Sequence, residues 1–533
     1  MTTLVWFRAD LRTRDHAALH AAALDGPVQA LFVACPGEWR AHDDAPAKID
    51  LIMRTLAVLR ADLAALGIPF TILAVPTAQA MPDAVVRTAG DIRCDTIRFN
   101  RQYELDEARR DERTIRLASA SGVRTIAHDD QSILAPGFVR TREGKPFTVF
   151  TPFKRAWMAL LDERGGLADG TAPLQVPIAR SPLPPPLDTA PDPIVAAFLT
   201  KGLPSPDRAR FAALWPAGEH EATRRLRAFV SGPLARYATD RDRPDLVGTS
   251  ALSPYLAIGA ISPRQCLAAA LDAKSRLPAS AAASIDTWIS ELIWREFYIH
   301  VMAAFARVVM GRAFKAATDR LPWRHDESDF ARWAEGRTGV PIVDAGMRQL
   351  LATGWMHNRL RMITAMYLSK NLFIDWRRGE RHFMRHLVDG FFASNNGGWQ
   401  WSASTGTDAA PYFRMFNPVS QSRRVDPAGD HIRRWVPELT GVTGDAIHDP
   451  HDEKFGLPPL ARAGLDYPPP MADQAASRER VMAAFARAAE SEVRPSRDRA
   501  SPHPAPAAPR SLPRKSPATP PPSTPARSRG RVP

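Results

Sequence analysis

The fold of this chain is decided by residues 354–413, which read GWMHNRLRMITAMYLSKNLFIDWRRGERHFMRHLVDGFFASNNGGWQWSASTGTDAAPYF. From Trp355 to Leu372 the apolar residues recur at helical spacing, so polar side chains such as Asn358 and Arg359 lie on or near buried faces. Buried polar and charged groups cost several kcal/mol each unless something bonds them. A large polar ligand with an aromatic ring system would bond them, so the stretch predicts a ligand site among helices.

The sequence Asn395-Asn396-Gly397-Gly398 interrupts the helical pattern of this stretch. Glycine weakens a helix and lets the backbone approach other groups closely. We therefore expect a turn at these four residues, at a point where the backbone comes close to something.

Residues 1 to about 130 alternate short apolar runs with amphipathic stretches at 47–66 and 103–121. The runs expected to be strands are 4–7, 28–34, 70–75, 96–100 and 124–128. This alternation is typical of a parallel sheet covered by helices on both faces, so a Rossmann-like α/β domain is expected at the N-terminus. Neither a GxGxxG motif nor a P-loop motif follows a strand, which argues against a dinucleotide site of that type.

The composition then changes along the chain. Residues 167–195 are dense in proline and poor in large apolar residues, as in an extended connector. From about residue 196 the apolar periodicity is helical, and after residue 490 the chain is mostly Pro, Ser, Ala and Arg, typical of disorder. The predicted domains are an α/β domain (1–130), a connector (131–195), an all-α domain (196–490) and a disordered tail (491–533).

The 533-residue chain has a formal net charge of +13, and the segment 491–533 contributes nine Lys/Arg against two Asp/Glu. The positive charge that remains suits nucleic acid, because neutralising phosphates releases counterions. An arginine-rich composition without such a partner is the alternative.

Three cysteines, Cys35, Cys94 and Cys266, lie far apart, so neither a disulfide framework nor a metal site is predicted. This usage is typical of the reducing cytoplasm. The first residues carry charges too close to a short apolar run for a signal peptide, and no apolar run is long enough to span a membrane. A cytoplasmic protein without a membrane partner is expected.

Three motifs, GWMHNRLRM, NNGGWQW and TGTDAAPYFR, resemble the photolyase/cryptochrome family, in the wording of its class I cyclobutane pyrimidine dimer (CPD) photolyases. The resemblance covers roughly residues 1 to 485, and its motifs are far more specific than a lone short motif. It implies an all-α domain that binds FAD in a U-shape, an antenna chromophore on the α/β domain, and UV-damaged DNA as partner. A monomer is expected, associated with the nucleoid in a prokaryote.

The sequence GTSALSPYL places hydroxyl groups at or just before an expected helix N-terminus, because Ser253-Pro254 and Ser262-Pro263 each put a capping serine before a proline. Such groups suit a pyrophosphate, although helix capping alone also explains them. In the resemblance this is the FAD phosphate loop. The cofactor-binding residues that it implies are Tyr237, Thr249, Ser250, Ala251, Leu252, Ser253, Trp288, Arg295, Arg361, Asp389, Gly390 and Asn395, with Asn395 facing flavin N5.

Residues 288–298 are predicted to form one helix, with Glu291 and Arg295 on the same face as Trp288. Taken alone, Glu291 is better explained as a member of a structural ion pair. The resemblance instead implies a pocket for a flipped-out lesion, with Arg241 and Arg359 contacting DNA phosphates. The pocket residues that it implies are Glu291, Trp294, Asn358, Met362 and Trp401.

The resemblance also implies an electron relay through Trp323, Trp376 and Trp399, by which light reduces oxidised FAD. Without the resemblance, three core tryptophans are the simpler interpretation. Repair does not require the relay once the flavin is reduced.

The antenna positions that the resemblance implies are His42, Asp106 and Glu107, which would contact methenyltetrahydrofolate (MTHF). The match is incomplete, because Asp106 stands where Asn is usual and the region around Val309 and Met310 lacks the expected Lys. A deazaflavin, a flavin or no antenna are the alternatives, as are plain surface roles for these residues.

The function predicted on this basis is light-driven reversal of CPDs by electron transfer from photoexcited FADH⁻ to the flipped-out dimer. A cryptochrome-type blue-light receptor is the main alternative, because it shares the fold and the chain has a tail after residue 490. Asn395 and the lesion-pocket set argue against a cryptochrome. A (6-4) photolyase, which uses His where this chain has Met362, is disfavoured.

Overall fold

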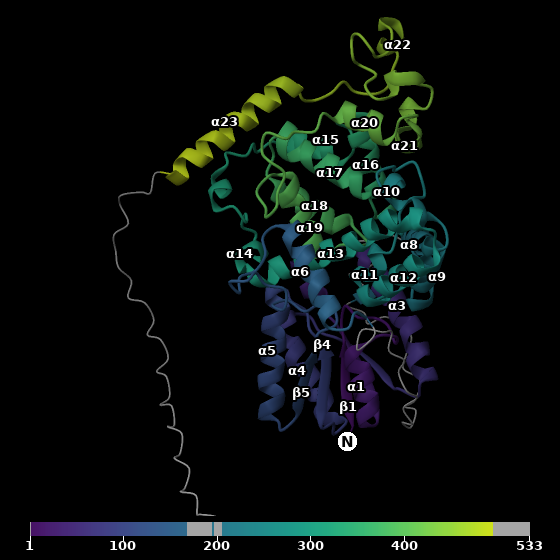
Figure 1. The fold of residues 1–533 in the computed structure, drawn as a ribbon, viewed down its shortest axis with the longest axis vertical. Coiled ribbons are helices and arrows are strands. Elements are labelled where there is room, and N and C mark those ends of the chain that lie inside the picture. The colour runs from purple at the N-terminus through teal and green to yellow at the C-terminus, as the bar shows by residue number, and fades with distance from the viewer. Residues whose placement is uncertain (1, 168–194, 197–204, 494–533) are drawn as a thin grey trace, which may run out of the picture.

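The computed structural model describes residues 2–167, 195–196 and 205–493. Figure 1 shows the sheet and its helices at one end of the molecule and the helical domain at the other. The predicted order, an α/β domain followed by an all-α domain, is confirmed. Residues 168–194 of the predicted connector and the predicted disordered tail from residue 494 onward lie outside the described residues.

Five parallel strands form the sheet in the order β3-β2-β1-β4-β5. Their limits agree with the predicted ones to within one residue. They are β1 (Thr3–Phe7), β2 (Val28–Ala34), β3 (Phe70–Ala74), β4 (Thr96–Asn100) and β5 (Arg124–His128).

Helices cover both faces of the sheet, as the alternation of apolar runs with amphipathic stretches predicts. These helices are α1 (Ala17–Asp25), α2 (Pro36–Ala41), α3 (Pro46–Ala65), α4 (Met81–Asp91) and α5 (Leu105–Ala120). Successive side chains of a strand point to opposite faces. Leu4 and Trp6 of β1 accordingly lie in one apolar cluster with residues of α4 and α5, and Val5 and Phe7 lie in another with residues of α1 and α3.

Beyond the sheet the described chain is mainly helical, as predicted for residues from about 196 onward. Its helices are α6 (Phe150–Glu163), α8 (Ser205–Leu214), α9 (Glu219–Val230), α10 (Tyr237–Asp240), α11 (Ser253–Ala257), α12 (Pro263–Arg276), α13 (Ala282–Ala304), α14 (Ala306–Val309), α15 (Glu327–Ala334), α16 (Pro341–Thr353), α17 (Asn358–Met366), α18 (Trp376–His386), α19 (Phe392–Ser402), α20 (Pro418–Val425), α21 (Asp430–Trp435), α22 (Pro459–Ala463) and α23 (Gln474–Val493). Within the described ranges, none of the helices combines the length and apolar character needed to cross a membrane.

Helix α6 falls inside the predicted connector, yet its Phe153 packs against Phe297 of α13, with ring centroids 5.3 Å apart. The exact domain limits therefore stay a prediction.

Helix α19 runs through Asn395, Asn396, Gly397 and Gly398, so the turn predicted at these residues is wrong. Gly397 serves close packing between helices, whereas a Cβ added at Gly398 would meet nothing within 4 Å. A Cβ added at Gly397 would lie 2.2 Å from a ring carbon of Tyr298 in α13. The backbone does come close to another group, as expected, but within a helix.

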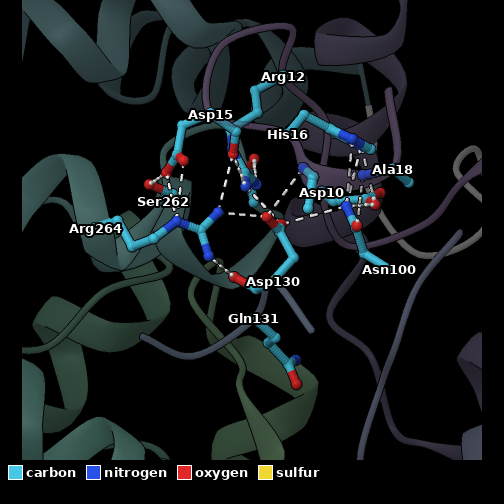
Figure 2. A network of polar contacts seen from close by, with 12 residues as sticks. Asp10, Arg12, Asp15, His16, Ala18, Asn100, Asp130, Gln131, Ser262 and Arg264 are labelled. Carbon is cyan, nitrogen blue, oxygen red and sulfur yellow. Dashed lines mark hydrogen bonds and ion pairs between the residues drawn. The ribbon is translucent and has the colours of Figure 1, made fainter. Parts of the chain in front are cut away.

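The two domains meet beyond the carboxyl ends of β1 and β4, where the strand order reverses (Figure 2). In open α/β sheets this crevice is the usual ligand site. Here Arg264 of α12 binds Asp15 and Asp130, and Arg12 binds Asp130 at 2.5 Å. Burial raises the pKa of Asp130, but the charges of Arg12 and Arg264 outweigh burial and hold that pKa well below its usual range. This buried ionic network fixes the helical domain against the sheet.

Candidate active site

A cavity of about 330 Å³ lies inside the helical domain, bounded by the segment 249–253 and by α10, α13, α17, α18 and α19. The cofactor-binding residues predicted from the sequence come together here, except Gly390, which lines a neighbouring cavity. Those that line the cavity are Tyr237, Thr249, Ser250, Ala251, Leu252, Ser253, Trp288, Arg295, Arg361, Asp389 and Asn395.

The segment 249–253 bends sharply, because Ala251 adopts a left-handed conformation with φ of +49°. Ser253 is the first residue of α11, so its predicted capping role is wrong, whereas Ser262 caps α12 as predicted. The Oγ of Ser253 instead accepts a hydrogen bond from Nε1 of Trp355 at 3.2 Å. Because α11 is only five residues long, hydroxyl and backbone N–H groups rather than a helix dipole would bind an anion here.

Arg361 and Asp389 form an ion pair at the cavity, with Nη2 of the arginine 2.7 Å from Oδ2 of the aspartate. Nε of Arg361 also donates to the carbonyl of Met356 at 2.8 Å. The other oxygen of Asp389, Oδ1, is buried without a hydrogen-bond partner among the described residues. Such an atom is costly unless a ligand donates to it.

Glu291 lies in the cavity wall beside Trp288 and Arg295, on the shared face of α13 that the spacing predicts. Its Oε1 accepts a hydrogen bond from Nη1 of Arg241 at 2.6 Å. Burial raises the pKa of Glu291, and the charge of Arg241 opposes this rise without cancelling it. The carboxyl group is therefore poised to carry a proton more readily than an exposed glutamate does.

Asn358 and Met362 of α17 line the same cavity, one helical turn apart. Trp294, Trp401 and Arg359 are not among its lining residues. The indole of Trp294 stacks on Phe150, with ring centroids 3.6 Å apart.

Asn395 reaches the cavity from α19, and its Nδ2 donates to the carbonyl oxygen of Glu380 at 3.0 Å. The side chain of Glu380 in turn accepts from Nδ2 of Asn396 at 2.8 Å. Burial raises the pKa of Glu380 to about 7. Sequence reasoning missed this glutamate, because only tertiary packing brings it to the two asparagines.

Trp399 lines the cavity, and Trp376 and Trp323 are buried in the same apolar cluster. The Nε1 of each of these three indoles has no hydrogen-bond partner in the described part of the chain. A fourth tryptophan, Trp333, packs edge-to-face against Trp399, with centroids 6.0 Å apart. Sequence reasoning missed Trp333, because nothing in its local motif distinguishes it from a core residue.

A second cavity, of about 410 Å³, lies between the α/β domain and the helical domain. It brings the predicted antenna residues together: Nδ1 of His42 is 3.5 Å from Oε1 of Glu107, and Nε2 is 3.8 Å from Oδ2 of Asp106. Burial raises the pKa of Glu107 to about 7.

Two further residues of this second cavity were not predicted. Oε2 of Glu104 and Oε1 of Gln131 are buried without a hydrogen-bond partner among the described residues. Figure 2 shows the side chain of Gln131 extending away from the interdomain network. Two buried acceptors at one cavity would be satisfied by a ligand with N–H or O–H groups.

Both domains match known family models. Residues 3–177 match the model of the DNA photolyase family, and residues 288–487 match that of the FAD binding domain of DNA photolyase. The chain is 47% identical to the deoxyribodipyrimidine photo-lyase of Vibrio cholerae over 84% of this chain and 92% of that protein.

Solved structures of photolyases and cryptochromes have the same fold. A bacterial class III photolyase from Agrobacterium tumefaciens superimposes with a TM-score of 0.79 at 34% identity, over 92% of this chain and 98% of that one. A Synechocystis cryptochrome superimposes with a TM-score of 0.78 at 27% identity, over 91% of this chain and 99% of that one. The chain belongs to the DNA photolyase family.

Proposed function

We propose that the protein reverses cyclobutane pyrimidine dimers in DNA by light-driven electron transfer, with FAD bound in the cavity of the helical domain. The observation that carries this proposal is that the predicted lesion residues Glu291, Asn358 and Met362 line the same cavity as the predicted flavin residues. A lesion held there would lie next to the cofactor. The family membership and the name of the Vibrio cholerae relative support the same activity.

The residues of the cavity fit FAD. The unpartnered Oδ1 of Asp389 would accept a hydrogen bond from the flavin, and Arg361 would balance the carboxylate charge. The hydroxyl groups of Thr249, Ser250 and Ser253 would hold the phosphates. When bound and reduced, FAD supplies the single electron that splits a cyclobutane ring, a reaction beyond any side chain.

The chain's own contribution is to bind, orient and stabilise the lesion. Asn358 would hydrogen-bond the amide edges of the two bases, and Met362 would give an adaptable apolar contact. Glu291, placed by Arg241, would stabilise negative charge that develops on a pyrimidine carbonyl by donating a hydrogen bond from its protonated carboxyl group. Trp294 of α13 and Trp401 of α19 would form aromatic walls for the flipped-out bases.

Two further features are part of the proposal. The protein would act as a cytoplasmic monomer, associated with the nucleoid in a prokaryote, and its three cysteines, which are free and buried, suit a reducing compartment. The proposed organisation is an α/β domain (1–130), a connector (131–195), an all-α domain (196–490) and a C-terminal tail (491–533).

Binding in the dark tests the substrate. The purified flavoprotein should bind a duplex with one defined thymine dimer at least about 1,000-fold more tightly than the matched undamaged duplex at a fixed salt concentration. Equal affinity for the two duplexes would contradict the proposal.

Glu291→Ala should leave FAD bound and lower the repair yield by about tenfold or more, because the variant lacks the group that stabilises the charged pyrimidine. Glu291→Gln should lower the repair yield less than Glu291→Ala does, since the side-chain amide can still donate a hydrogen bond. Both yields are measured as dimers lost per absorbed photon on chemically reduced protein. An unchanged yield in Glu291→Ala would remove the proposed role.

We also propose that the 410 Å³ cavity binds an antenna chromophore, MTHF, through the predicted residues His42, Asp106 and Glu107 together with Glu104. Glu104→Ala should lower the amount of MTHF retained after reconstitution, without changing the FAD content, because FAD occupies the other cavity. The near-UV absorbance of the reconstituted protein measures both. Retention of a deazaflavin or a flavin but not MTHF would overturn the identity of the antenna.

A further inference from the structure

The two arginines expected to contact DNA phosphates are both bound to carboxylates in this structure. Arg241 binds Glu291. Arg359 of α17 binds Asp242, a residue of the loop after α10. A phosphate that approaches Arg359 therefore meets an anion that is already in place.

The contact between Asp242 and Arg359 is extensive. Nη2 of the arginine lies 2.6 Å from Oδ2 and 2.7 Å from Oδ1, and Nε lies 3.1 Å from Oδ1. Arg424 of α20 approaches Oδ2 of the same aspartate to 3.5 Å. Asp242 thus holds two arginines that come from different helices, and 31% of its side chain is exposed to solvent.

Asp242 is charged at neutral pH. Burial raises its pKa, but the hydrogen bonds from Arg359 and the charges of Arg359, Arg241 and Arg424 outweigh burial, so the pKa lies below its ordinary value. A carboxylate paired side-on with a guanidinium uses the same donors that a phosphate would use. Asp242 consequently engages the N–H donors of Arg359 that a bound phosphate would engage.

We infer that Asp242 is a specificity-determining residue, which lowers the affinity for undamaged DNA and fixes the orientation of Arg359 for the lesion complex. This inference rests on the proposed function. Binding to undamaged DNA is dominated by phosphate charge, so a fixed carboxylate beside the arginines weakens it. Binding of a lesion depends on where the contacting side chains are placed. The Nε and Nη2 bonds to Asp242 fix the guanidinium group of Arg359, which lies on the same helix as Asn358 and Met362.

Removing the negative charge of Asp242 should therefore change the affinities for undamaged and for dimer-containing duplex differently. Asp242→Asn should bind undamaged duplex about five- to tenfold more tightly, and the slope of log K against log salt concentration should steepen by up to about one. Affinity for the dimer-containing duplex should change by less than about threefold, because the gain in charge is offset by a less ordered Arg359. The ratio of the two affinities then falls.

The matched control is Asp272→Asn. Asp272 pairs with Arg276 on the exposed surface of α12, so this variant removes the same charge from a remote ion pair. Its affinity for both duplexes should stay within about twofold of wild type. FAD content and thermal midpoint, measured on every variant, establish that each one is folded.

Asp242→Glu separates charge from geometry. It keeps the carboxylate, so its affinity for undamaged duplex should equal that of wild type, while its affinity for the dimer duplex should fall with the altered placement of Arg359. If Asp242→Asn changes both affinities by the same factor, or weakens binding to undamaged DNA, the inference is wrong. Failure of the proposed function would look different, because wild type itself would then not distinguish the two duplexes.

Discussion

Trp399→Phe is expected to reduce light-driven reduction of bound oxidised FAD to the level of the dark control, while leaving repair by chemically reduced protein intact. Trp399 is the member of the predicted relay that lines the flavin cavity, and Trp376 and Trp323 lie in the same buried cluster. An indole ring can be oxidised transiently, whereas a phenyl ring in its place cannot donate the electron. Flavin absorbance during illumination with an external reductant measures the first effect, and dimer loss measures the second.

Trp6→Phe is the matched control for that experiment. Trp6 is fully buried and its Nε1 is also without a partner among the described residues, but it lies in the sheet of the other domain. Photoreduction in this variant should equal that of wild type. Photoreduction that persists in Trp399→Phe would refute the relay.

Gly397→Ala is expected to destabilise the protein by about 3 kcal/mol or more, because the new methyl group overpacks the interface between two helices. The added Cβ would meet three ring carbons of Tyr298 at 2.2 to 2.6 Å, and a ring on a buried helix cannot move aside freely. Helix α19 would shift, and with it Asn395 and Trp399 at the cavity. Chemical denaturation measures the loss of stability, and the FAD content should fall with it.

Gly90→Ala provides the comparison. Gly90 also lies in a helix, α4, but an added Cβ there meets nothing within 4 Å. This substitution should raise stability by up to about 1 kcal/mol, the helix propensity difference between alanine and glycine. If Gly397→Ala proves as harmless as Gly90→Ala, the close packing of α19 on α13 is not important for folding.

The strands were predictable from the sequence because both faces of the sheet are covered. The central strands β1 and β2 are consequently rich in apolar residues, and β4, although it carries Arg98 and Asn100, was predicted at its observed limits, 96–100. The helices of the second domain followed in the same way from their periodicity. The residues of the flavin cavity were predictable only through long, specific motifs.

The error at Asn395 to Gly398 shows where local propensity fails. Each glycine disfavours a helix by about 1 kcal/mol, and tertiary packing overrides this when small residues are needed at a contact. Ser253 shows a similar limit, because its hydroxyl is used by Trp355, a residue about one hundred positions away, instead of capping its own helix.

The residues that sequence reasoning missed share a physical cause. Glu380, Trp333 and Asp242 each acquire significance from a partner brought near by folding, and no local spacing encodes that partner. Glu104 came closest to being predictable, because it immediately precedes the acidic first turn of α5 that supplied Asp106 and Glu107.

Light-dependent repair tests the central claim most directly. Reduced, FAD-containing protein would be mixed with DNA that carries one defined thymine dimer, illuminated with near-UV to blue light, and followed for dimer loss beside a dark control and a (6-4) lesion. We expect the dimer to disappear only in the light, with the (6-4) lesion unchanged. Persistence of the dimer despite bound, reduced FAD would contradict the repair activity and favour a light-sensing role.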